Sequence, residues 1–270
     1  MQAATDGAAL AAAWEALLVA ELSDPFALLG PHEDAQGQWW IRCFLPGAAA
    51  VTAVSPDALS VLVELVCIDD RGLFVARVPR RRKRFDYRLR VHWRAFYVTE
   101  VIDDPYRHGP LLGEMDLWLL AEGTEQRPHD KLGAHPRSDA GVEGTAFAVW
   151  APHALRVAVV GDWNHWDERR HPMRLRREAG VWEIFLPGVS PGACYKYAVL
   201  DAHGVSTPWR ADPYARQSEL RPATASVVAA PLAAPRTAPR ITSHTTPMAV
   251  YEVHVGSWRR AGVHGERWPS

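Results

Sequence analysis

Residues 142–161, with the sequence VEGTAFAVWAPHALRVAVVG, contain two short apolar segments separated by a turn. Ala146–Ala151 and Arg156–Gly161 are rich in valine, alanine and aromatic residues, and a proline lies between them, so each is predicted to form a β-strand. Further segments of this kind follow at Val181–Leu186, Cys194–Leu200 and Ala225–Val228. Short strands separated by Gly, Pro and Asp at such spacings are typical of a β-sandwich.

An upstream region repeats the same order of motifs. Phe44-Leu45-Pro46 corresponds to Trp150-Ala151-Pro152, Gly72-Leu73-Phe74 to Gly180-Val181-Trp182, Tyr87 to Tyr197, and Asp104-Pro105-Tyr106 to Asp212-Pro213-Tyr214. The offsets are 106, 108, 110 and 108 residues, and four ordered matches at nearly one offset indicate two copies of one sandwich plan. The predicted strands of the upstream copy are Trp39–Leu45, Val51–Val54, Val61–Val66, Leu73–Val78, Phe85–His92 and Phe96–Thr99.

Three other regions are expected to differ from the sandwiches. Residues 7–22 form an Ala- and Leu-rich pattern with one apolar face, which predicts a helix with Asp6 as its N-cap. Residues 103–137 are expected to be an irregular bridge, and the basic run at residues 80–84 is interpreted as a solvated hairpin loop. Residues 229–247 are rich in Pro, Ala and Thr and are predicted to be a linker.

The composition excludes several classes of partner. The formal net charge of −1 creates no overall field that would attract nucleic acid or an anionic membrane. There is no apolar run of about 18 residues or more, and the N-terminus lacks the pattern of a targeting segment. Cys43, Cys67 and Cys194 are far apart, which predicts unpaired, buried thiols in a reducing compartment, while twelve histidines without paired spacing predict no metal site. A cytoplasmic location is expected.

The C-terminal stretch has the pattern of a strand that opens a sheet. Tyr251, Val253 and Val255 alternate with Glu252 and His254, which is typical of a strand with one buried face. Only ten residues follow Arg260, and a single strand with two open edges is not stable in water. The remainder of that sheet is therefore expected to be absent from this chain.

These motifs resemble the 1,4-α-glucan (glycogen) branching enzymes. The stretch Tyr251–Arg260 is similar to the first barrel strand of the α-amylase superfamily, and its Ser-Trp-Arg points to the branching enzymes. Asp24–His32, with the form Asp-Pro-Phe-x-x-Leu-Gly-Pro-His, is similar to the start of these enzymes, and the region from Asp104 to His135 is similar to the joint between their two N-terminal domains. Glu125 and Pro128–Asp130 depart from the family pattern.

The resemblance implies a mainly β fold: two tandem immunoglobulin-like β-sandwiches with a short N-terminal helical segment, plus a truncated start of a (β/α)8 barrel. The expected domains are residues 1–30 (helical segment), 31–137 (first sandwich and bridge), 138–228 (carbohydrate-binding-module-like sandwich), 229–247 (linker) and 248–270 (first strand of the catalytic barrel).

The resemblance also implies an activity for the parent enzyme. Branching enzymes cleave an α-1,4-glucan and transfer the chain to a 6-hydroxyl, forming α-1,6 branches in glycogen, without a metal or organic cofactor. Their catalytic carboxylates come from later barrel strands, so no catalytic residue carries over and the 270 residues alone are predicted to be inactive. The expected partners are an α-glucan and the missing catalytic barrel. The alternative is a stand-alone α-glucan-binding or scaffold module without enzymatic activity.

The second predicted sandwich carries the candidate glucan site. A strand ends at Gly161 and is followed by Trp163, Asn164 and Trp166 on a turn, which offers flat aromatic faces and polar groups to a sugar. With Lys196, this region resembles a family-48 carbohydrate-binding module, whose binding members contact sugar through the tryptophan and lysine that match Trp166 and Lys196. Their second tryptophan and their asparagine fall near Gly204-Val205 and Ser226 here, so half of the platform is missing. Trp209 lies close to the lost position, but the spacing does not place it there. The alternative is that Trp163 and Trp166 only pack, in a module that braces the barrel.

Overall fold

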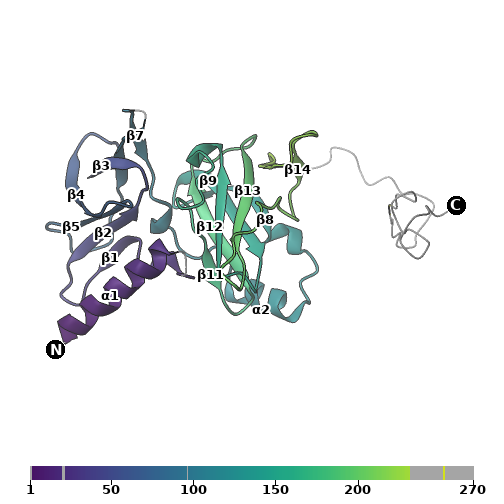
Figure 1. Ribbon diagram of the computed structural model, residues 1–270, viewed down its shortest axis with the longest axis horizontal. Coiled ribbons are helices and arrows are strands. Elements are labelled where there is room, and N and C mark those ends of the chain that lie inside the picture. The colour runs from purple at the N-terminus through teal and green to yellow at the C-terminus, as the bar shows by residue number, and fades with distance from the viewer. Residues whose placement is uncertain (1, 20–21, 96, 232–251, 253–270) are drawn as a thin grey trace. The chain divides into compact units, whose positions relative to one another are not determined.

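Figure 1 shows the computed structural model, which describes residues 2–19, 22–95, 97–231 and 252. The described chain is mainly β and contains two sandwiches in tandem, as the sequence predicts. The linker beyond residue 231 and the expected barrel strand, apart from Glu252, lie outside the described residues.

The first sandwich is a single antiparallel sheet of seven strands that folds over its own core. The strand order is β1-β2-β5-β4-β3-β6-β7. The strands are β1 (Gly30–Glu33), β2 (Trp39–Phe44), β3 (Ala48–Val54), β4 (Val61–Asp69), β5 (Leu73–Val78), β6 (Arg88–Trp93) and β7 (Thr99–Ile102). The first half of β4 pairs with β3, at Val51 and Leu65, whereas its second half pairs with β5, at Val66 and Val75. Strand β4 therefore connects the two layers, between which Ile41, Phe74 and Tyr87 are buried.

The second sandwich consists of two separate four-stranded sheets. One has the order β10-β13-β15-β14 and the other β11-β12-β9-β8. The strands are β8 (Gly133–Asp139), β9 (Val142–Trp150), β10 (Arg156–Gly161), β11 (Arg174–Arg176), β12 (Val181–Pro187), β13 (Cys194–Leu200), β14 (Gln217–Ser218) and β15 (Ser226–Val227). Trp182, Phe147, Tyr195 and Tyr197 fill the space between the sheets because alternate residues of each strand face inward. The boundary expected at residue 138 falls within β8.

The repeat predicted from the sequence is confirmed by matching contacts in the two sandwiches. The Tyr87 hydroxyl donates to Asp104 Oδ2 (2.6 Å), and the Tyr197 hydroxyl approaches Asp212 Oδ2 (3.3 Å). Each aspartate also accepts the backbone N–H two residues later, at Tyr106 (2.9 Å) and Tyr214 (2.8 Å). The Asp-Pro-Tyr motif therefore forms the same corner twice.

The structure extends this repeat to a second pair of motifs. Gly30 has φ +91° and Gly133 has φ +107°, a region that side chains rarely adopt. A Cβ on Gly30 would lie 2.5 Å from the Tyr106 carbonyl oxygen, and a Cβ on Gly133 would lie 3.1 Å from that of Tyr214. The Leu-Gly-x-His segment at the start of each sandwich thus packs against the Asp-Pro-Tyr corner near its end, which makes both glycines necessary.

Two regions differ from the sequence-based expectation. The first helix, α1, runs from Gln2 to Leu18 instead of over residues 7–22, consistent with the high helix propensity of the alanines before Asp6. The bridge expected to be irregular contains α2 (Glu114–Glu122) and β8. Helix α2 ends at Gly123, whose φ of +73° provides a left-handed C-cap. It was missed because only Leu117 is buried among its nine residues, so its apolar periodicity is weak.

The helix α1 contributes to the joint between the two sandwiches. Leu17 belongs to the same buried cluster as Phe44 of the first sandwich and Phe147 of the second. The Tyr106 hydroxyl also crosses the joint and donates to the carbonyl of Pro172 (3.2 Å). The two sandwiches therefore share a hydrophobic core, and their contact does not depend on surface contacts alone.

The cysteines are free, as predicted, but they are not all buried. Cys43 is buried, and burial raises the pKa of its thiol well above the ordinary value. Cys194 is half-buried, whereas Cys67 is exposed on β4 and its Sγ lies 3.2 Å from the Asp69 carbonyl oxygen. The expectation of burial is wrong for Cys67: Val66, Cys67 and Ile68 are all exposed, and because successive side chains of a strand point to opposite faces, this part of β4 is uncovered on both faces.

No helix in the described part of the chain combines the length and apolar character that crossing a bilayer requires.

Candidate functional site

The loop that follows β10 holds three of the four predicted sugar-binding residues. It consists of a 3-10 turn at Asp162–Asn164, followed by His165 (φ 54°) and Trp166 (φ 59°), both in the left-handed region. Two consecutive non-glycine residues there cost about 1–3 kcal/mol each and persist only where the surroundings hold them in place. Such strained loops are frequent at binding sites.

Asn164 holds this loop from the inside. It is fully buried, and its side-chain Oδ1 accepts from the Gly161 N–H (3.0 Å). Its Nδ2 donates to the Val159 carbonyl (3.0 Å) and to His171 Nδ1 (2.9 Å). Burial and neighbouring charge lower the pKa of His171 to about 3, so the ring is neutral and can accept this bond. Both polar atoms of the Asn164 side chain are therefore hydrogen-bonded within the protein. Because the residue is also fully buried, it is not available to contact a sugar at the surface.

Trp163 and Trp166 have different surroundings. Trp163 is half-buried, packs against the core shared by the two sandwiches, and has its ring centre 5.7 Å from that of Phe147. A Cβ on Gly161 would come within 2.6 Å of the Trp163 ring, so the glycine makes room for it. Trp166 instead packs on Val160 and its neighbours on the outer face of the β10–β13 sheet.

Trp209 provides the second aromatic ring beside Trp166. The two rings stack with their centres 5.6 Å apart and their planes inclined by 17°. Trp166 Nε1 donates to Asp162 Oδ1 (3.1 Å), and Trp209 Nε1 lies 3.4 Å from Glu168 Oε2. Trp209 is 40% exposed and Trp166 is half-buried, so Trp209 presents more of its surface to solvent.

Lys196 lies on the same outer face. It stands opposite Val160 in the β10–β13 register, and Val160 is part of the surface on which Trp166 packs. Its Nζ donates to Thr224 Oγ1 (2.7 Å). We refer to Trp166, Trp209 and Lys196 as the outer-face site. Two stacked indoles on a face that also carries a lysine and polar groups can hold a sugar through ring stacking and hydroxyl hydrogen bonds.

Sequence reasoning did not place Trp209 in this site. The residue after it, Arg210, forms a β-bridge with Tyr197, and both of its backbone hydrogen bonds to Tyr197 are 2.8 Å long. This bridge brings Trp209 alongside β13, although 43 residues separate it from Trp166. The position where the family asparagine was expected holds Ser226, which is buried and accepts the Asp212 N–H (2.9 Å).

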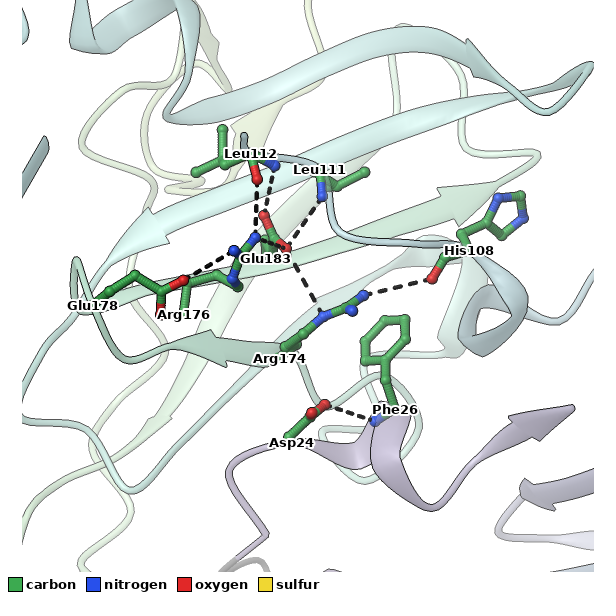
Figure 2. Close-up of polar contacts among 9 residues, drawn as sticks. All are labelled: Asp24, Phe26, His108, Leu111, Leu112, Arg174, Arg176, Glu178 and Glu183. Atoms are coloured by element: carbon green, nitrogen blue, oxygen red, sulfur yellow. Dashed lines mark hydrogen bonds and ion pairs between the residues drawn. The ribbon is translucent and has the colours of Figure 1, made fainter. Parts of the chain in front are cut away.

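A second polar cluster, shown in Figure 2, surrounds the fully buried Glu183 of β12. Its carboxylate accepts the N–H groups of Leu111 (3.2 Å) and Leu112 (3.0 Å) and a bond from Arg176 Nη1 (3.2 Å). Arg174 Nε lies 3.8 Å from the same carboxylate. This cluster attaches the bridge segment to the second sandwich.

Arg174 extends the cluster to the N-terminal segment. Its guanidinium carbon lies 3.8 Å from the centre of the Phe26 ring, and its Nη2 lies 3.5 Å from the His108 carbonyl oxygen. Asp24 caps the turn that carries Phe26 by accepting its N–H (3.0 Å). The polar groups around Glu183 are thus engaged in joining three segments of the chain, which is a structural role.

The described chain forms a pair of β-sandwich domains, the second of which carries the outer-face site. Residues 131–215 match the family described as carbohydrate-binding module 48 (isoamylase N-terminal domain). Residues 11–106 match the N-terminal domain of the alpha-1,4-glucan branching enzyme GlgB. The two matches lie in tandem, and together they support an N-terminal region of the branching-enzyme type.

Solved structures similar to this chain include two pullulanases. Ligand-free PulA from Klebsiella pneumoniae is 16% identical over 75% of this chain and 21% of its own, with a TM-score of 0.33. Pullulanase from Anoxybacillus sp. LM18-11 complexed with maltotetraose is 19% identical over 75% of this chain and 26% of its own, with a TM-score of 0.30. This chain therefore spans about a quarter of the length of these proteins.

Proposed function

We propose that this chain is the glucan-binding N-terminal portion of a 1,4-α-glucan branching enzyme, and that the outer-face site binds α-glucan. The parent reaction would cleave an α-1,4 link and transfer the chain to a 6-hydroxyl. The observation that carries the proposal is the stack of half-buried Trp166 and exposed Trp209 on a sheet that also bears Lys196. The apolar face of a glucose ring packs on an indole, and the charged groups beside the stack can bind its hydroxyls.

We propose further that the described residues supply no catalytic group. The mechanism of the family needs a nucleophilic carboxylate and an acid/base carboxylate about 5–5.5 Å apart. The buried carboxylates Asp104, Glu183 and Asp212 each accept hydrogen bonds from the protein's own groups. Purified chain is accordingly expected not to increase the α-1,6 content of amylose. The free cysteines support a cytoplasmic location for the parent enzyme.

Affinity electrophoresis in native gels with and without amylopectin tests the binding proposal. Trp209→Ala and Trp166→Ala each remove one ring of the stack. Aromatic pairing is worth about 0.5–1.5 kcal/mol, so each substitution should weaken the apparent affinity roughly 2- to 12-fold. Lys196→Met should weaken it as well, because it removes the cation but keeps the length of the side chain.

Trp150→Ala provides the matched control. Trp150 is 60% exposed but lies at the end of β9, on the other sheet of the same sandwich. Its removal should leave retardation by amylopectin unchanged. Equal retardation of the wild-type chain and of the Trp166→Ala and Trp209→Ala variants would rule out the outer-face site as the site of glucan binding.

A further inference from the structure

The five consecutive basic residues at positions 80–84 form an exposed loop that the proposed glucan binding does not use. The loop follows β5 and precedes β6, which are not neighbours in the sheet order. It therefore connects the two layers of the first sandwich and is not the hairpin loop that the sequence suggests. Among the described residues, no member of this run forms an ion pair.

The base of this loop is anchored on the first sandwich. Phe85 is half-buried, and its ring centre lies 5.9 Å from that of Trp39 in the core. Arg84 Nη2 donates to the Arg107 carbonyl oxygen, and the guanidinium carbon of Arg81 lies 5.1 Å from the centre of the Phe85 ring. The cations are thus presented from a fixed base, which reduces the conformational entropy that a ligand has to remove.

Arg42 extends the positive charge onto the neighbouring strands. It lies on the outer face of β2, since the residues on either side of it are buried in the core, and its side chain is half-buried. Among the residues that the structure describes, its guanidinium forms no hydrogen bond or ion pair. Burial lowers the pKa of His32 on β1, and the charges of Arg42 and Arg84 lower it further, although the bond to the Leu29 carbonyl opposes the shift. Because both arginines act on one ring, Arg42, His32 and residues 80–84 belong to one surface, which we call the basic face.

Three carboxylates close to the basic face are already engaged. Asp34 accepts the Trp40 Nε1 hydrogen (2.8 Å), and Asp86 lies 3.4 Å from Arg107 Nη1. Asp24 caps the turn after it, as described above. The six arginines and lysines of the basic face are therefore left to interact with an external anion.

The chemistry of these side chains decides which anion fits. Ordering several long arginine side chains costs conformational entropy, which an anion with a single charge does not offset. Adjoining phosphate groups carry several charges over a short distance, and their oxygens bind guanidinium groups in a bidentate manner. Single-stranded nucleic acid also requires aromatic platforms for its bases, whereas Phe85 is half-buried and lies against Arg81. The observations therefore favour a chain of phosphates over a nucleic acid.

We propose that the basic face binds a chain of two or more adjoining phosphate groups, as in inorganic polyphosphate or the diphosphate of a nucleotide, and that the phosphates are the part recognised. The guanidinium groups of the loop donate to the phosphate oxygens, and Arg42 binds the end of the chain that lies on β2. The basic face belongs to the first sandwich, so the inference goes beyond the proposed glucan binding and does not require it.

Isothermal titration calorimetry of the full chain at low ionic strength tests the inference, with tripolyphosphate, diphosphate, orthophosphate and ADP as probes. We expect saturable binding whose affinity falls from tripolyphosphate to diphosphate to orthophosphate, because each phosphate adds contacts. ADP should bind as diphosphate does, because only its phosphates are held. Arg82→Gln and Arg42→Gln should each raise the Kd for tripolyphosphate by about threefold or more, since each removes charge-assisted contacts to phosphate.

Arg94→Gln is the matched control. Arg94 is also exposed and, within the described part of the chain, forms no ion pair, but it follows β6 at the end opposite to the loop. Its substitution should leave the Kd for tripolyphosphate unchanged. If Arg42→Gln does not fold, Arg82→Gln, at an exposed loop position, provides the measurement. Trp209→Ala should bind tripolyphosphate as the wild-type chain does, so failure of this inference leaves the proposed glucan binding intact.

Four results would overturn the inference. Without saturable binding of tripolyphosphate, the loop is only a solvated surface. Equal losses of affinity in Arg82→Gln and Arg94→Gln would show a general attraction by the charge of the chain. Orthophosphate that binds as tightly as tripolyphosphate would exclude recognition of a phosphate chain. ADP or a single-stranded oligonucleotide that binds more tightly than tripolyphosphate would show that a nucleoside or a nucleic acid is recognised instead.

Discussion

Substitution of Glu183 by alanine is expected to remove much of the stability of the second sandwich. The side chain is fully buried and accepts two backbone N–H groups, from Leu111 and Leu112, as well as a bond from Arg176. Figure 2 shows that these partners come from the bridge and from β11, so Glu183 connects two segments of the chain to β12.

The expected loss of stability comes from the buried polar groups that would no longer have Glu183 as their partner. Removing one partner of a buried ion pair costs about 3–5 kcal/mol, because the remaining charge stays buried. The two orphaned amides would each cost about 1–3 kcal/mol, which is a similar total. Since most domains are stable by only about 5–15 kcal/mol, Glu183→Ala should bring this one close to unfolding.

Urea unfolding of the chain, followed by far-ultraviolet circular dichroism and tryptophan fluorescence, measures the effect. Glu178→Ala is the control: Glu178 also pairs with Arg176 (2.9 Å), but its side chain is 53% exposed. An exposed pair contributes about 0–1 kcal/mol. If Glu183→Ala and Glu178→Ala differ by less than about 1 kcal/mol in the free energy of unfolding, the reasoning about the buried carboxylate is wrong. Glu183→Gln, which keeps the volume, provides the measurement if the alanine variant does not fold.

Two further predictions concern the loop and the first sandwich. Gly161→Ala should destabilise the chain by about 1–3 kcal/mol in thermal unfolding, because its Cβ would lie 2.5 Å from a backbone oxygen and 2.6 Å from an indole ring. Gly109→Ala places its new Cβ in open space, with nothing within 4 Å, and should lower the stability by less than about 0.5 kcal/mol. Equal losses of stability in the two variants would show that a Cβ at residue 161 causes no steric clash. Burial raises the pKa of Asp104 from 3.8 to about 6, although the Tyr87 hydroxyl and the Tyr106 N–H oppose the shift. Because the folded-state pKa of Asp104 lies above its unfolded-state pKa, the protonated carboxyl stabilises the folded chain fully below pH 3.8, and this stabilisation is lost as the pH rises through 6. Over that range the free energy of unfolding of the wild-type chain should fall by roughly 3 kcal/mol relative to that of Asp104→Asn. Urea unfolding from pH 3.5 to 7 measures this change. If the free energies of unfolding of the wild-type chain and Asp104→Asn differ by the same amount at every pH, the raised pKa of Asp104 is contradicted.

The repeat shows why part of the fold could be predicted from the sequence. Asp104 and Asp212 each cap their own turn through the N–H two residues later, which is a local interaction between neighbours in the chain. In contrast, the equivalence of Gly30 and Gly133 was not recognised, because each is required by a carbonyl more than 70 residues away.

The candidate site was only partly predictable for the same reason. Trp166 and Lys196 were expected near each other, and the register of β10 and β13 places both on one face. Trp209 could not be placed, because its position depends on the bridge between Arg210 and Tyr197. The exposed Cys67 was unexpected because β4 changes layers along its length, which a regular alternation of residues does not reveal.

The sequence by itself determined the mainly β architecture and the duplication, because strand alternation and turn residues act over a few positions. Only the tertiary structure decided the roles of the tryptophans: Trp166 stacks with Trp209 on the outer face, while Trp163 packs against the core shared by the two sandwiches. The physical reason is that burial and stacking depend on contacts between residues far apart in the chain, and these contacts exist only after the sheets have paired.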